Sequence, residues 1–164
     1  MNFDASLQHI RTVLLALPPS GEGGFEDLLA TAVAAATGLQ IRLARSGSQF
    51  GRDGSSPAGL FAVAVEAKRY DGNLRLEGLA GKATLASYAL GKDTDLWLLG
   101  TTAELGDDVV RKLPEIVQSE GMSVVFLDWA PRPLPALAVL LASRAEATRD
   151  WFAHHAPSTG DKTW

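Results

Sequence analysis

Cysteine is absent from the 164 residues of this chain. Its absence excludes disulfide bonds and thiolate metal sites, and a chain without disulfides suits a reducing compartment. Long apolar runs are also missing: none approaches the roughly 20 residues that a membrane-spanning helix needs. The first six residues, Met-Asn-Phe-Asp-Ala-Ser, show no basic segment before an apolar stretch, as a secretory signal would. We therefore expect a cytoplasmic protein with no membrane partner.

A nucleotide-binding loop of the type Gly-x-x-x-x-Gly-Lys-Ser/Thr does not occur in the sequence, so we do not expect this chain to hydrolyse nucleotides. Internal repeats and low-complexity segments are absent as well. Apolar residues make up 46% of the chain and charged residues 21%, which are ordinary proportions for a globular protein. The length suits one domain with a sizeable core.

Basic residues are fewer than acidic ones, and the formal net charge is −4. This balance argues against a protein that coats nucleic acid, because phosphate binding is largely electrostatic. The charge is unevenly distributed, however: residues 42–92 carry a net charge of +4 and the rest of the chain −8. Either the positive segment forms a phosphate-binding surface, or the imbalance is the usual scatter of charge in a short window.

Hydrophobic periodicity predicts helices at residues 4–17, 25–37, 76–90, 107–120 and 136–154, and strands at residues 39–43, 60–68, 96–101 and 123–128. Residues 46–59 have the Gly, Ser and Pro content of a loop, and the tail from Pro157 is expected to fray, with Trp151 half exposed. The last two strands are short and apolar with a helix between them, which implies a parallel crossover, whereas the first two resemble an antiparallel pair. The predicted fold class is α/β: three α/β/α layers with a central mixed sheet.

The candidate site lies in residues 49–70, where Asp53 occupies a glycine-flanked bend and an apolar strand ends in Glu66-Ala67-Lys68. Alternation along a strand sends Glu66 and Lys68 to the same face. A hairpin centred on Gly59-Leu60 places residue 53 directly opposite residue 66, with facing Cβ atoms roughly 5 Å apart. The sequence therefore predicts two carboxylates and one amine close together.

Two neighbouring carboxylates suit Mg²⁺, which favours oxygen ligands and keeps several waters. The metal would lower the pKa of a bound water, and Lys68 would position that water and offset charge in the transition state. These roles predict Asp53, Glu66 and Lys68 as catalytic residues of phosphodiester hydrolysis. A simpler interpretation stays open, in which Glu66 and Lys68 are surface charges at a strand end and Asp53 is a turn residue.

Two segments, Gly51-Arg52-Asp53-Gly54 and Glu66-Ala67-Lys68-Arg69-Tyr70, resemble the PD-(D/E)xK nucleases, closest to the Mrr-like restriction endonucleases. The resemblance covers residues 20–130 and implies a restriction-endonuclease-like fold with Asp53, Glu66 and Lys68 as its core triad. It also implies cleavage that depends on Mg²⁺, with Mn²⁺ as a substitute. Glu26 matches a metal-supporting glutamate of this branch, although an acid there also complements the helix dipole. Arg52 departs from the proline of the family pattern.

The predicted organisation is an N-terminal helix at residues 1–20, a nuclease core at 21–130, and a C-terminal helix and tail at 131–164. Three further stretches, at 101–102, 127–129 and 134–142, look similar to nuclease domains at the N-termini of bacterial antiviral NTPases. This likeness implies an NTPase or sensor region that is not in this chain.

We therefore expect a Mg²⁺-dependent endodeoxyribonuclease, acting as a restriction or antiviral-defence effector, with Arg52, Arg69 and Lys82 on DNA phosphates. A homodimer is the simplest way to cut both strands of a duplex. One alternative is a catalytically silent module of the same fold that binds nucleic acid or protein, against which the intact triad argues. Another is a structure-selective repair nuclease, which residue types at the site cannot distinguish.

Overall fold

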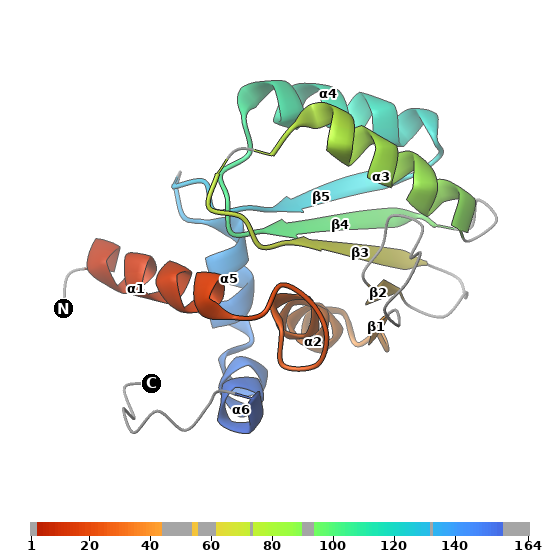
Figure 1. The fold of residues 1–164 in the computed structure, drawn as a ribbon. Helices are drawn as coiled ribbons and strands as arrows, with labels where there is room; N and C mark the ends of the chain where they lie inside the picture. Colours follow the sequence, from red (N-terminus) through yellow and green to blue (C-terminus); the bar gives the residue numbers. More distant parts are fainter. Residues whose placement is uncertain are drawn as a thin grey trace.

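The computed structural model describes residues 3–43, 54–55, 62–72, 74–89, 94–131 and 133–155 (Figure 1). Its helices are α1 (Phe3–Ala16), α2 (Phe25–Thr37), α3 (Leu76–Ala89), α4 (Asp107–Ser119), α5 (Ala136–Ser143) and α6 (Ala145–His155). Its strands are β1 (Arg42–Leu43), β2 (Gly54–Ser55), β3 (Val63–Lys68), β4 (Leu96–Thr101) and β5 (Ser123–Leu127).

One mixed sheet contains the five strands, in the order β1-β2-β3-β4-β5. β1, β2 and β3 pair antiparallel, whereas β3, β4 and β5 pair parallel. Helix α3 connects β3 to β4, and α4 connects β4 to β5. The predicted mixed sheet, its antiparallel start and its parallel crossover are confirmed.

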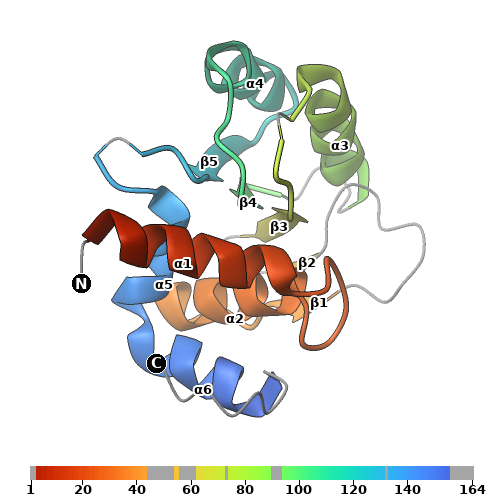
Figure 2. The same ribbon diagram turned by 60° about the vertical axis from the view of Figure 1, so that its left-hand side comes forward.

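Helices cover both faces of this sheet, and both ribbon views show the three layers (Figures 1 and 2). On the side that we call the α3–α4 face, Ala64, Trp97 and Leu99 pack against those two helices. On the other side, which we call the α2 face, Val65 and Leu98 pack against a cluster from α1, α2, α5 and α6. The α/β class with helices on both faces is therefore as predicted.

The segment at residues 136–154 is not one helix, as predicted, but two. The chain leaves the helical conformation at Arg144, where φ is −122° and ψ is 45°, and the Thr148 hydroxyl donates to the Leu141 carbonyl across the break. The break turns α6 so that Trp151, 5% exposed, and Phe152, 7% exposed, enter the core. Burying two aromatic side chains contributes roughly 3–6 kcal/mol to the free energy of unfolding. This exceeds the contribution of the few helical hydrogen bonds that the break removes. The prediction of a half-exposed Trp151 was wrong for the same reason.

Residues 46–59 were expected to be loop, but Gly54 and Ser55 form β2 and pair with Val65 and Ala64. The other residues of that segment, and the tail from Pro157, lie outside the described residues. None of the described helices combines the length and the hydrophobicity that a membrane span requires.

Candidate active site

Glu66 is the central feature of the candidate site, because it is a carboxylate inside a buried strand. It lies on β3 with an exposure of 0%, between Val65 at 1% and Ala67 at 6%. Since side chains alternate along a strand, Glu66 and Lys68 share the α3–α4 face with Ala64. A carboxylate in this position is costly unless cations or hydrogen-bond donors stabilise it.

Two amines stabilise the Glu66 carboxylate. The Lys68 Nζ forms an ion pair with Glu66 Oε1 from the same face of β3. The Lys82 Nζ, on α3, lies 3.8 Å from the same oxygen. The Lys68 side chain is 22% exposed and that of Lys82 is 42% exposed, so the amines link the buried carboxylate to solvent. The predicted Glu66–Lys68 juxtaposition is thus present, and the interpretation of Glu66 as a surface charge is excluded.

The three side chains carry a net charge of +1 on a molecule whose net charge is −4. A partly exposed pair of amines over a buried carboxylate attracts anions, since interactions with phosphate are strongest where charges are only partly solvated. Sequence reasoning named Lys82 as a phosphate contact but missed its approach to Glu66. No local pattern signals this contact, because it depends on how the β3–α3–β4 crossover folds back on the sheet.

Asp53 and Arg52 lie outside the described residues. The adjacent Gly54 pairs with Val65, and Ser55 pairs with Ala64, in an antiparallel ladder. A hairpin that sets residue 53 opposite residue 66 also sets 54 opposite 65 and 55 opposite 64. The predicted register is therefore confirmed for both residues of β2.

Glu26 and Arg69 belong to the opposite side of the sheet from Glu66. Glu26 is in the first turn of α2, which packs on the α2 face, and its Oε2 accepts a 3.4 Å hydrogen bond from the Gly21 amide. The Arg69 guanidinium donates from its Nη1 to the Leu15 carbonyl near the end of α1. Arg69 thus ties α1 to the sheet, a role that its place beside Lys68 in the sequence did not indicate.

No complete metal site is present among the described residues. Within the described ranges, no three His, Asp or Glu side chains are close enough together to hold a metal ion. The predicted ligand set includes Asp53, so this search leaves that set untested. Glu66 contributes one carboxylate, and Glu26 does not complete a described cluster with it.

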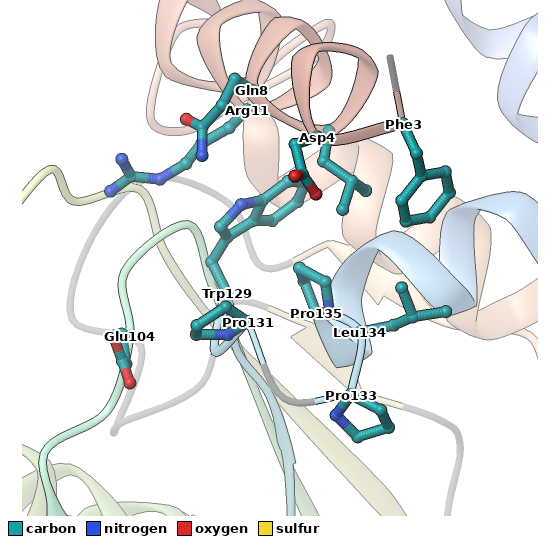
Figure 3. Close-up of a pocket in the computed structure, with 11 residues that line it drawn as sticks. Phe3, Asp4, Gln8, Arg11, Glu104, Trp129, Pro131, Pro133, Leu134 and Pro135 are labelled. Atoms are coloured by element: carbon teal, nitrogen blue, oxygen red, sulfur yellow. The ribbon is translucent and has the colours of Figure 1, made fainter.

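A cleft of about 610 Å³ opens elsewhere, between α1 and the segment that joins β5 to α5 (Figure 3). Its lining includes Phe3, Gln8, Trp129 and three prolines, and Figure 3 shows the Trp129 ring beside Gln8 and Asp4. Arg11 also lines it, and its guanidinium donates to the Thr102 carbonyl at 2.9 Å and pairs with Asp71 at 3.1 Å. Neither Glu66 nor the two amines line this cleft.

Comparison with known proteins adds no assignment, since no protein-family model and no curated protein sequence matches this chain.

Proposed function

We propose that this chain is a metal-dependent endonuclease that hydrolyses DNA phosphodiester bonds at Asp53, Glu66 and Lys68. The observation that carries the proposal is the buried Glu66 carboxylate in ion contact with Lys68 on one face of β3. A fully buried carboxylate paired with amines is costly to fold and is more typical of a reaction centre than of a scaffold.

The order of elements supports a restriction-endonuclease-like core. Helix α2 precedes the antiparallel strands β1, β2 and β3, and α3 then leads to β4, parallel to β3. In chain order these elements are a helix, three strands, a helix and a strand, which is the order of the superfamily core that the sequence resembles. In this fold, we propose that the chain acts as a restriction or antiviral-defence effector.

The donor chemistry fits Mg²⁺ in part. Glu66 offers carboxylate oxygens, the ligand type that Mg²⁺ prefers. We assign the second ligand to Asp53, which is covalently joined to Gly54, the partner of Val65. Glu26 is a weaker third choice, because α2 covers the other face of the sheet. When bound, Mg²⁺ would polarise the phosphoryl group and activate a water molecule.

The amines would perform the remaining chemistry. Lys68, whose Nζ is already aimed at Glu66, would donate hydrogen bonds to the attacking water and to the phosphoryl oxygen that gains charge in the transition state. Lys82 is more exposed, so it would bind a neighbouring phosphate rather than the reacting atom. Arg69 is not included, since its guanidinium bonds to α1.

The decisive experiment is cleavage of supercoiled plasmid with Mg²⁺, with Mn²⁺ or with EDTA. We expect metal-dependent nicking by the parent and a loss of about 100-fold or more in Lys68→Ala, as for removal of one transition-state donor. Asp53→Ala should lose at least as much, because it removes a proposed metal ligand. Lys112→Ala is the matched control, because this exposed lysine is on α4, the helix of the next crossover, and forms no described ion pair with Glu66. Cleavage that survives Lys68→Ala would remove the site assignment.

A second set of variants separates chemistry from folding. Lys68→Met removes one of the two amines that pair with the buried Glu66 carboxylate, and we expect a loss of about 3 kcal/mol in the free energy of unfolding. Glu66→Gln/Lys68→Met removes both charges and should recover most of that loss while remaining inactive. If the parent neither cuts DNA nor binds Mn²⁺ in a titration, the silent binding module replaces this proposal.

A further inference from the structure

Among the described strands, β5 is the last of the sheet, and its outer edge pairs with none of them. No described strand lies beyond it, and its exposed residues include Ser123 and Val125, the latter with 41% of its surface accessible. An open edge presents backbone donors and acceptors that another strand can pair with.

The direction of these groups follows from the ladder with β4. The Ser123 amide donates to the Asp95 carbonyl at 2.9 Å, so Ser123, Val125 and Leu127 direct their backbone groups toward β4. Because backbone groups alternate along a strand, Val124 and Phe126 direct theirs outward. Each carries one N–H and one C=O, which gives the edge two donors and two acceptors.

The strand lacks the features that usually protect an edge. Natural edge strands carry Lys, Pro, a bulge or an inward-pointing charge to prevent pairing. Ser123-Val124-Val125-Phe126-Leu127 contains no charge and no proline, and its pairing with β4 is continuous from Ser123 to Leu127. The unpaired edge of β5 is therefore able to form a backbone ladder with another strand.

We propose that β5 pairs antiparallel with β5 of a second copy of this chain, forming one continuous sheet through both. The two-fold axis passes through Val125, so that Val125 faces Val125, and Val124 exchanges both backbone hydrogen bonds with Phe126 of the other copy. This register uses all the outward donors and acceptors of both strands.

A second copy fits better than an unrelated strand because β5 is complementary to itself. The outward groups fall symmetrically about Val125, and no like charges meet across the axis. The exposed Val125 side chains cover each other as a non-hydrogen-bonded pair, the arrangement with the closest Cα atoms. The inference does not depend on the nuclease proposal, although an axis perpendicular to the sheet would put both Glu66 residues on the same face of the dimer.

Engineered cysteines test the register directly, because the chain has none of its own. Facing Cβ atoms at Val125 would be roughly 4.5–5.5 Å apart, close enough for a disulfide after a small adjustment. We expect Val125→Cys to form a covalent dimer under mild oxidation with diamide. Val110→Cys is the control, since that α4 residue is 45% exposed but is not on the edge, and it should crosslink at least tenfold more slowly.

Light scattering during size-exclusion chromatography tests association itself. The parent should have twice the chain mass of 17.4 kDa, and Val125→Lys, which places like charges on the axis, should reduce it to the single-chain mass. Val110→Lys should stay dimeric. Val124→Pro offers a second variant, because it removes an outward N–H and leaves the ladder to β4 intact. A monomeric parent at all concentrations, or a dimer that Val125→Lys does not change, would overturn the inference.

Discussion

A single carboxylate distinguishes this sheet from an ordinary α/β core. Glu66 is among the largest fully buried side chains, in the company of Trp97, Phe25 and leucines. Two lysines reach it, one along its own strand and one from α3. Water would solvate an exposed carboxylate, whereas a buried one needs compensating cations. The two lysines provide that compensation for Glu66.

Gly100 allows a test of how tightly the core packs against β4. A Cβ built on this β4 residue would lie 2.3 Å from Leu29 Cδ2 and 2.8 Å from Cδ1, and Leu29 is 0% exposed. We expect Gly100→Ala to lower the free energy of unfolding by about 1–3 kcal/mol through overpacking.

The control for that test is Gly81→Ala on α3, where an added Cβ meets nothing within 4 Å. It should raise the free energy of unfolding by about 0.5–1 kcal/mol, because alanine loses less entropy in a helix than glycine. Urea unfolding measures both. Equal effects of the two substitutions would show that Leu29 moves aside freely.

At the scale of elements, α4 shows tertiary packing that overrides local propensity. The helix runs from Asp107 to Ser119 with Pro114 inside it, although proline removes one helical hydrogen bond and clashes with the preceding turn. Val109, Leu113 and Val117 are each 0% exposed and hold the helix on the sheet. Burying three such side chains contributes roughly 4–9 kcal/mol, more than the proline costs.

Replacing this proline should therefore stabilise the helix. We expect Pro114→Ala to raise the free energy of unfolding by about 1–2 kcal/mol, since an amide becomes available to the Val110 carbonyl, less the entropy that proline removes from the unfolded chain. Glu115→Ala, one residue further along α4, should change it by under about 0.5 kcal/mol. Thermal unfolding followed by circular dichroism measures both, and a destabilised Pro114→Ala would show that the ring packs better than we infer.

For the whole molecule, the proposed DNA binding must overcome a net charge of −4. The basic excess of residues 42–92 includes both lysines that contact Glu66, so attraction should be local and strongly salt-dependent. If Lys82 contacts one phosphate, Lys82→Ala should reduce the slope of log K against log salt by about 0.9.

Fluorescence anisotropy with a labelled duplex, at several salt concentrations and in EDTA, measures that slope without cleavage. Lys112→Ala removes the same charge from α4, outside the basic segment, and should leave the slope unchanged. Equal slopes for the parent and Lys82→Ala would remove Lys82 from the phosphate contacts and leave the Glu66–Lys68 pair as the centre of the site.

Most of the helices and strands, and the pairing of Glu66 with Lys68 at the candidate site, followed from the sequence pattern. Alternation in β3 and the hairpin register are local properties, which is why Glu66 beside Lys68, and Gly54 opposite Val65, were predicted from spacing. Tertiary structure alone decided the approach of Lys82 to Glu66, the break at Arg144 and the placing of Glu26 and Arg69 on the α2 face. These depend on which helix covers which face, and burial across the whole core sets that choice, not the preferences of neighbouring residues.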